Sequence, residues 1–175
     1  FYDALSAYNV PGTDLLLVDV DTSTHGDFTS WAPLYSVTDE VGKDVVVVGR
    51  GATRGNQVRE AGDNELKGWK YLGNLKQRWG TNTIEQYADL LVEADEKLVY
   101  ATFDAAIGGN EAHLANWDSG GGMFILDGGE WKLAGVHIGV DAGFNTTDSG
   151  TGFTAALFDA GGLYYDPSVP FTGPW

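Results

Sequence analysis

Short apolar runs bounded by turn-forming residues recur along the chain. Residues 15–20 are apolar apart from Asp19, and residues 45–48 are four consecutive valines that end at Gly49. Runs of this length, rich in β-branched residues and flanked by turns, favour β-strands over helices. We therefore expect both segments to be buried strands.

The rest of the chain carries the same kind of pattern. Residues 123–126 and 131–136 are apolar runs separated by an Asp-Gly-Gly turn, which is typical of a β-hairpin. Residues 85–98 have helical spacing, although a strand-rich setting can override it. Further strands are expected at residues 80–84, 97–103 and 152–158. Many short strands with glycine-rich turns predict an all-β protein built as a barrel or a sandwich.

Composition and charge narrow the choice of partners. The 175 residues include 25 Asp and Glu against 10 Lys and Arg, for a net charge of −15, and no cysteine. This charge repels nucleic acid and anionic membranes, so we expect neither as a partner. No apolar run approaches the roughly 20 residues that cross a bilayer, so no membrane span is expected. Residues 1–42 carry seven acidic groups and no Lys or Arg, which fits either an anion-repelling surface or a solubilising exterior.

The sequence contains no convincing pattern of metal ligands. His25, His113 and His137 lack the close spacing of a zinc site. The Asp-rich segment that begins at Asp19 has Thr24 at the position where a calcium loop needs glycine. We therefore predict no metal and no cofactor.

A glycine-rich turn stands directly before the predicted hairpin. Residues 116–122 read Asn-Trp-Asp-Ser-Gly-Gly-Gly. A serine nucleophile needs such a turn, because the turn exposes Oγ and aims backbone N–H groups at the point where an oxyanion forms. The same residue types also favour an ordinary surface turn, so Ser119 is either a nucleophile or a turn residue.

In combination, several segments resemble the trypsin-like (chymotrypsin-fold) serine proteases. The family's nucleophile motif, Gly-Asp-Ser-Gly-Gly-Pro before a hairpin, is similar to residues 117–122. Residues 13–18 resemble the family's Asp-Ile-Ala-Leu-Leu segment, and residues 150–165 are similar to the tail of secreted bacterial members. The resemblance implies a secreted or cell-surface bacterial protein.

The resemblance also implies a domain organisation, that of a double β-barrel whose first barrel is incomplete in this chain. Residues 1–32 would be the C-terminal part of the first barrel and the crossing. Residues 33–175 would be the second barrel, which carries the nucleophile, and a C-terminal tail.

The resemblance assigns roles to particular residues. Ser119 would be the catalytic nucleophile, Asp14 the catalytic acid that orients a histidine, and the N–H groups of Trp117 and Ser119 the oxyanion hole. Structural positions in the turn would be Asp118, Gly120 and Gly121, with the Asp118 carboxylate in an ion pair such as one with a processed amino terminus. The substrate pocket would be lined by His113, Asn116, His137, Ile138 and Gly139.

One stretch of that pocket also bears on specificity. Residues 135–139, Gly-Val-His-Ile-Gly, resemble the Gly-Ile-His-Trp-Gly of glutamate-specific members, in which the histidine helps to bind an acidic side chain. This implies a preference for an acidic residue before the scissile bond. Otherwise His113 and His137 are simply one packed core histidine and one loop histidine.

The departures from the family concern the catalytic machinery. Family members place a histidine well before the acid, but none of the thirteen residues before Asp14 is histidine. Trp117 replaces a glycine, and Ile138 replaces a serine that bonds the catalytic acid. The base therefore lies on a separate N-terminal companion segment, or the chain is an inactive homologue. The start at Phe1 suggests a processed product or a fragment. An incomplete first barrel would expose an apolar face around residues 15–20, which favours a companion segment that covers this face.

We therefore expect a serine endopeptidase that cleaves peptide or protein substrates through an acyl-enzyme and is active only with a histidine-bearing N-terminal segment. The main alternative is a catalytically inactive homologue that acts as a protein-binding module. A carbohydrate-binding β-domain would fit the abundant Trp, Tyr, Asp and Gly, but it leaves the order of Asp14, Ser119 and the hairpin unexplained.

Overall fold

The computed structural model describes residues 2–88, 97–105, 109–140, 143–149, 151–165 and 169–170, and in these ranges every regular element is a β-strand. The strands are, in chain order, β1 (Ala4–Asn9), β2 (Leu16–Val20), β3 (Asp44–Gly49), β4 (Thr53–Arg59), β5 (Leu66–Leu72), β6 (Arg78–Thr83), β7 (Gln86–Ala88), β8 (Leu98–Tyr100), β9 (Gly122–Asp127), β10 (Glu130–Val136), β11 (Phe144–Asn145), β12 (Ala155–Leu157), β13 (Tyr164–Tyr165) and β14 (Val169–Pro170). The expected all-β class is confirmed. No helix in these ranges has the length and hydrophobicity needed to cross a membrane.

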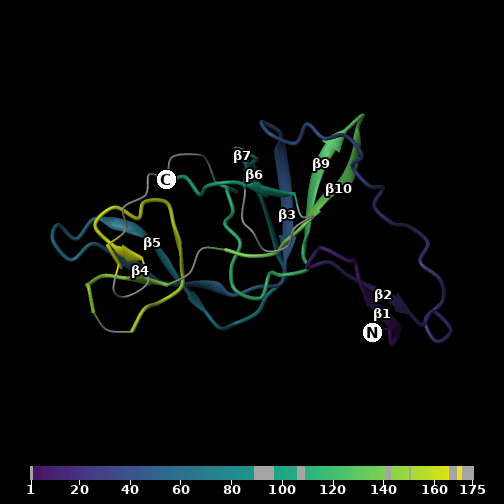
Figure 1. Ribbon diagram of the computed structural model, residues 1–175, viewed down its shortest axis with the longest axis horizontal. Coiled ribbons are helices and arrows are strands. Elements are labelled where there is room, and N and C mark those ends of the chain that lie inside the picture. Colours follow the sequence, from purple (N-terminus) through teal and green to yellow (C-terminus); the bar gives the residue numbers. More distant parts are fainter. Residues whose placement is uncertain are drawn as a thin grey trace.

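The central sheet has the strand order β10-β9-β3-β6, with every neighbouring pair antiparallel (Figure 1). Strand β3 occupies an inner position because its valines place apolar side chains on both faces. Val45 pairs with Ile125, and both side chains are 2% exposed. Together with Ile84 and Met123 they form one hydrophobic core. The β9–β10 hairpin turns through Gly128 and Gly129, which both have positive φ, as a two-residue hairpin turn requires.

A second sheet, of order β12-β5-β4, lies at the opposite end of the molecule from the N-terminus (Figure 1). Its core contains Val58, Phe144, Ala155, Ala160 and Leu163. Two smaller groups, β11-β13-β14 and β7-β8, complete the pairing of the described strands. These are separate antiparallel sheets, and the described strands do not close into a barrel.

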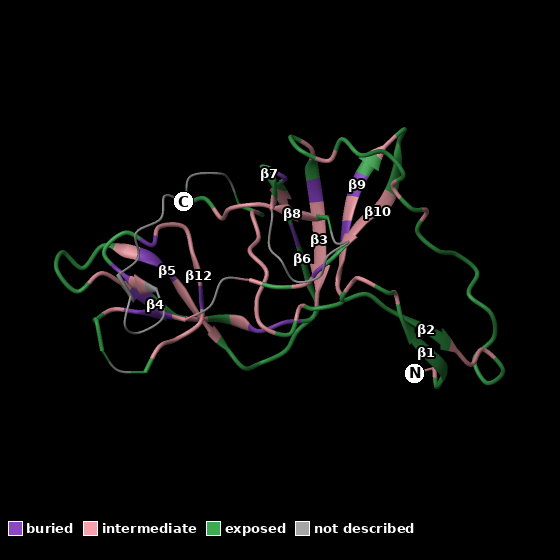
Figure 2. Ribbon diagram, viewed as in Figure 1, coloured by how far each residue is buried: buried purple, intermediate pink, exposed green. Residues whose placement is uncertain are grey.

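The N-terminal hairpin of β1 and β2 stands apart from the other sheets (Figure 1). Its strands pair in antiparallel fashion from Ala4 opposite Val20 to Asn9 opposite Leu16. Figure 2 shows both strands coloured as exposed, and Leu5 is 68% and Leu16 52% exposed. The prediction of a strand at residues 15–20 is thus confirmed, but its burial is wrong, because no other described strand pairs with or covers this hairpin.

The other predicted strands are found with shifted bounds. The four valines form β3, and the predicted hairpin is β9–β10. The runs at residues 80–84, 97–103 and 152–158 appear as β6, β8 and β12. The segment with helical spacing begins with a strand, β7, and its residues 89–96 lie outside the described part of the chain.

Candidate functional site

The turn that carries Ser119 is closed by Asp118. The Asp118 N–H donates to the Ala115 carbonyl at 3.0 Å, and the Asp118 carbonyl accepts from the Gly121 N–H at 2.9 Å. The Asp118 carboxylate reaches back to accept the Ala115 N–H at 2.9 Å. Three hydrogen bonds of one residue therefore fix the peptides on either side of Ser119.

A second set of bonds ties this turn to the segment that follows β10. The Gly120 N–H donates to the His137 carbonyl at 2.9 Å, and the His137 N–H donates to the Gly121 carbonyl at 2.8 Å. Gly121 allows this approach because a Cβ at this position would lie 2.5 Å from the Val48 carbonyl oxygen and 2.8 Å from His137 Nδ1. The turn, β3 and the His137 segment therefore form one closely packed unit.

Room for the Asp118 side chain comes from the end of β3. A Cβ on Gly51 would lie 2.5 Å from Asp118 Cγ. Sequence reasoning used Gly49 and Gly51 only as the end of a strand and missed this role. The sequence shows two glycines separated by one residue, but nothing in it indicates that the Asp118 side chain packs against them.

Trp117 has a backbone conformation that side chains normally avoid. Its φ is 71°, in the left-handed region that glycine favours and that a bulky residue rarely adopts. The resemblance places a glycine at this position, so the tryptophan takes the backbone conformation that a glycine would supply. Such outliers concentrate at functional sites, where the surrounding structure holds the strain.

The backbone donors beside Ser119 are not used within the turn. The N–H groups of Trp117 and Ser119 take part in no hydrogen bond with other residues in the described ranges. Ser119 itself is exposed, and its hydroxyl makes one long bond, 3.4 Å, to the Ile138 carbonyl. The turn therefore presents a hydroxyl and two unengaged N–H donors.

A cavity of about 370 Å³ adjoins this turn. It brings together Ser119 with four of the five residues expected to form the substrate pocket, Asn116, His137, Ile138 and Gly139. The fifth, His113, does not line this cavity but lines neighbouring ones. Its Nδ1 lies 3.2 Å from the Tyr71 hydroxyl and 2.5 Å from the Leu114 carbonyl.

The two pocket histidines are held in apolar surroundings. Burial lowers the pKa of His137, although the nearby Asp118 carboxylate raises it in part. Its side chain is 7% exposed, and neither ring nitrogen has a hydrogen-bond partner among the described residues. Burial also lowers the pKa of His113, opposed by its bond to the Leu114 carbonyl. Both imidazoles are therefore neutral near pH 7, and a neutral His137 offers a carboxylate one N–H donor but no charge.

Other predicted site residues lie elsewhere. Asp14 lies in the turn between β1 and β2, on the exposed hairpin. His25 packs its ring against Tyr2 at a centroid distance of 5.3 Å. Ser119 has no histidine partner in the described part of the chain, and its hydroxyl bonds only to a carbonyl. Asp118 takes part in none of the salt bridges found among described residues, and Phe1 lies outside them.

One group of carboxylates lies close enough to share a cation. Glu60, Asp63 and Glu65 gather at the turn between β4 and β5. The buried Lys67 ammonium lies 3.4 Å from Glu60 and 2.8 Å from Glu65, so its single charge offsets part of the negative charge of this group. Glu60 and Glu65, together with Asp159, therefore pair with a buried lysine.

The geometry therefore brings together an exposed serine hydroxyl, two unengaged N–H groups and an adjoining cavity, whereas Asp14 lies on the separate β1–β2 hairpin. Comparison of the chain with protein-family models, with curated proteins and with solved structures returns no match.

Proposed function

We propose that this chain is the nucleophile-bearing part of a serine endopeptidase of the trypsin-like type. The observation that carries the proposal is the Ser119 turn, in which an exposed hydroxyl stands beside two unengaged N–H groups and Trp117 holds a left-handed φ of 71°. Preorganised donors of this kind stabilise the oxyanion of acyl transfer and are worth about 3–4 kcal/mol each. An ordinary surface turn has no need of the strained conformation at Trp117.

The proposed chemistry follows from these groups. Ser119 Oγ attacks the peptide carbonyl while a histidine takes its proton, and the N–H groups of Trp117 and Ser119 hold the resulting oxyanion. The histidine then gives the proton to the leaving amine, and an acyl-enzyme forms on Oγ. Water, activated by the same histidine, hydrolyses the ester and restores the serine. Asp14 would orient that histidine.

The proposed histidine comes from a segment that docks on this chain, because none of the described histidine rings hydrogen-bonds to the Ser119 hydroxyl. The β1–β2 hairpin provides the supporting observation. Two-stranded hairpins are at best marginally stable alone in water, and this one exposes Leu5, Leu16, Leu17 and Val18 by 45% or more. Additional strands that cover this hairpin would bury the remaining exposed area of these side chains, which stabilises by roughly 0.7–2 kcal/mol each. We propose that such strands complete a first barrel, carry the base close to Asp14, and belong to a secreted or cell-surface assembly.

The cavity beside Ser119 is the proposed subsite for the residue before the scissile bond. An acidic preference remains a weaker part of the proposal, because burial holds His137 neutral. We expect His137→Ala to lower cleavage after Glu far more than cleavage after Leu. Equal losses for both substrates would contradict the acidic preference.

A second function is favoured by one observation. Since Ser119 has no histidine partner among the described residues, the chain is alternatively an inactive homologue that binds proteins through the same surface. The two functions differ in covalent chemistry, because only the enzyme makes an ester on Ser119.

The proposal is tested on the assembly as isolated from its source, with a library of peptide substrates. We expect hydrolysis that is lost in Ser119→Ala and strongly reduced in Asp14→Asn, and unchanged in the control Ser36→Ala, a serine on an exposed loop. Leu17→Asp should reduce activity of the assembly without altering unfolding of the chain alone, because Leu17 is 45% exposed. Hydrolysis that survives Ser119→Ala would contradict the proposed enzyme.

A further inference from the structure

The cations of this acidic chain fall into two groups. Lys43, Lys67, Lys97 and Lys132 form salt bridges with carboxylates, and Arg59 bonds to the Asn64 carbonyl and the Gln57 side chain. The other cations have no carboxylate partner within the described ranges, and they are Arg50, Arg54, Lys70, Lys76 and Arg78. Since acidic groups outnumber basic ones by 25 to 10, five cations without a carboxylate partner are unexpected by chance alone.

These unpaired cations gather around one cavity. Arg54 on β4, Lys70 on β5, Lys76 in the following loop and Arg78 on β6 all line a cavity of about 330 Å³. Arg50 lies between Gly49 and Gly51, which line it as well. Arg54, Lys76 and Arg78 therefore bring positive charge to the lining of this cavity, beside the carboxylates of Glu111 and Asp118, on a protein whose net charge is −15. The Lys70 ammonium lies over the Phe153 ring, 4.2 Å from its centroid.

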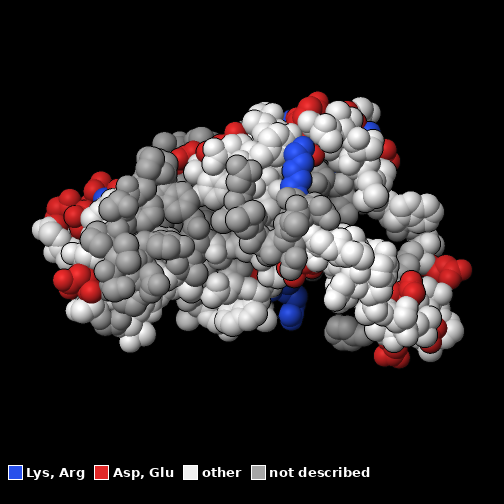
Figure 3. All heavy atoms as spheres, in the orientation of Figure 1, with Lys and Arg blue, Asp and Glu red and all other residues white. Residues whose placement is uncertain are grey.

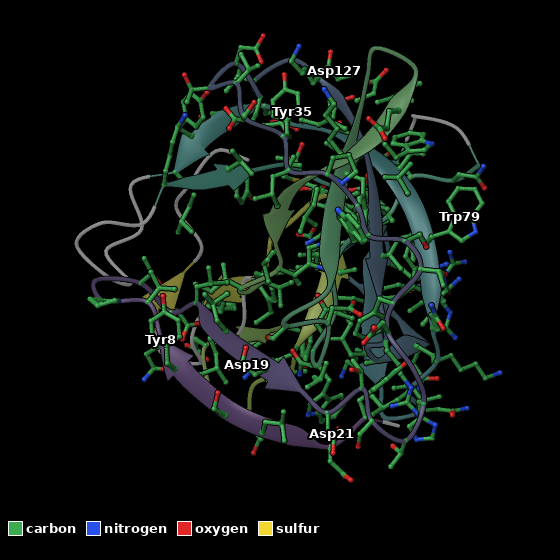
Figure 4. The ribbon with its side chains drawn as sticks, turned by 90° about the vertical axis from the view of Figure 1, so that its right-hand side faces the viewer. Tyr8, Asp19, Asp21, Tyr35, Trp79 and Asp127 are labelled. Atoms are coloured by element: carbon green, nitrogen blue, oxygen red, sulfur yellow. The ribbon has the colours of Figure 1, made fainter. Side chains whose placement is uncertain are left out.

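The same cavity has aromatic walls. Its lining includes Trp69, Tyr71, Trp79 and Phe103. The Arg54 guanidinium lies 4.5 Å from the centroid of the Trp69 ring, a cation–π contact that holds the charge at the wall. Trp79 is 64% exposed, and its ring points outward from the edge strand β6, to which it belongs (Figure 4). A simple inorganic anion uses no such flat apolar surface, whereas a peptide does.

One further group calls for a hydrogen-bond donor. Glu111 lines the cavity, and its Oε2 is buried without a hydrogen-bond partner in the described part of the chain. A buried acceptor left unpaired costs roughly 1–3 kcal/mol, more when it is charged. A ligand that suits this cavity therefore carries anionic groups for the cations and an N–H for Glu111.

We propose that this cavity binds a short acidic peptide segment, whose carboxylates contact the unpaired cations and whose backbone N–H groups reach Glu111. Long polyanions fit less well, because the net charge of −15 repels them; Figure 3 shows part of this charge as Asp and Glu side chains at both ends of one face of the molecule. The cavity also differs from the one beside Ser119, although Asp118 and His137 line both. A bound segment would thus lie against the residue that closes the Ser119 turn. The inference does not depend on the proposed peptidase activity.

The test measures binding of a capped tri-glutamate peptide to the full chain, in a Ser119→Ala background that removes hydrolysis. Tryptophan fluorescence reports it, because Trp69 and Trp79 line the cavity. We expect saturable binding that weakens with salt, and no binding of capped tri-glutamine. The double variant Lys76→Ala with Arg78→Ala should weaken binding roughly tenfold, since each charge-assisted bond is stronger than a neutral one.

The matched control is the double variant Lys43→Ala with Lys132→Ala. It removes the same net charge from residues that do not line the cavity. It should change affinity less than twofold, and circular dichroism checks that both variants fold. Equal weakening by both variants, equal binding of tri-glutamine, or no binding of tri-glutamate at about 1 mM would overturn the proposal. Competition by inorganic phosphate as strong as that by the peptide would also overturn it, because the aromatic walls and Glu111 would then have no role.

Discussion

The left-handed backbone at Trp117 gives the most specific prediction for stability. Replacing the residue with Gly or with Ala removes the same indole, so the difference between the two variants isolates the backbone. A residue with a Cβ costs roughly 1–2 kcal/mol in the left-handed region. Glycine in turn lowers the stability of the folded chain by about 0.5–1 kcal/mol relative to alanine, because it gives the unfolded chain more conformational freedom. Since φ is 71° at this position, we expect Trp117→Gly to be more stable than Trp117→Ala by about 0.5–1 kcal/mol.

The matched comparison uses Trp131, which is 48% exposed and lies within strand β10 without a positive φ. There the order should reverse, with Ala more stable than Gly by about 0.5–1 kcal/mol. Urea unfolding of the four variants measures both differences, and thermal unfolding should show shifts of about 2–4 °C per kcal/mol. If Ala is the more stable residue at both positions, the reasoning about the strained turn is wrong.

The remaining predictions concern packing, pH and buried charge. Gly121→Ala should lower the free energy of unfolding in urea by about 1–3 kcal/mol, because its Cβ would press on the Val48 carbonyl. Gly139→Ala, which has open space around the added Cβ, should change it by no more than about 0.5 kcal/mol. Equal effects of the two substitutions would refute the crowding at Gly121. Burial lowers the pKa of His137 in the folded chain, so this histidine takes up a proton at higher pH in the unfolded chain than in the folded one. The free energy of unfolding should therefore fall as the pH drops below about 6.5. His137→Gln should flatten that decline, and an unchanged pH profile would count against a buried neutral imidazole. Lys67→Met should lower the free energy of unfolding by about 2 kcal/mol in the same assay. The loss is smaller than for a fully buried ion pair because the carboxylate partners of Lys67 are 28–60% exposed. A variant more stable than the parent chain would show that these ion pairs contribute nothing to stability.

Local patterns were sufficient to predict the strands of the central sheet. The valines of β3 and the Asp-Gly-Gly turn between β9 and β10 specify strand and hairpin within a few residues. Strands β4 and β5 were missed because Gly55, Gly68 and scattered polar residues break the apolar alternation. The burial of β2 was predicted wrongly. Its apolar run shows only that an apolar surface exists, whereas burial depends on whether another strand packs against that surface.

The candidate site was predictable to a similar degree. Glycines mark both parts of this site in the sequence: Gly120 and Gly121 follow Ser119, and Gly139 follows the cavity residues His137 and Ile138. The spacing of the motif is therefore enough to find them. The left-handed Trp117 was not predictable, since a tryptophan gives no local signal for positive φ. His113 was placed in the same pocket as Ser119, but its bonds to Tyr71 and Leu114 hold it in neighbouring cavities. The cavity lined by Arg54, Lys76 and Arg78 combines residues of five strands, and only the folded chain brings them together.

The most direct test of the central claim is covalent labelling of Ser119 by a fluorophosphonate, located by mass spectrometry of peptides. No histidine in the described ranges hydrogen-bonds to the Ser119 hydroxyl, so added imidazole should supply a base and accelerate labelling in a saturable way. We expect the adduct on Ser119, none in Ser119→Ala, and faster labelling in the native assembly without imidazole. Absence of a Ser119 adduct both with imidazole and in the assembly would contradict the account.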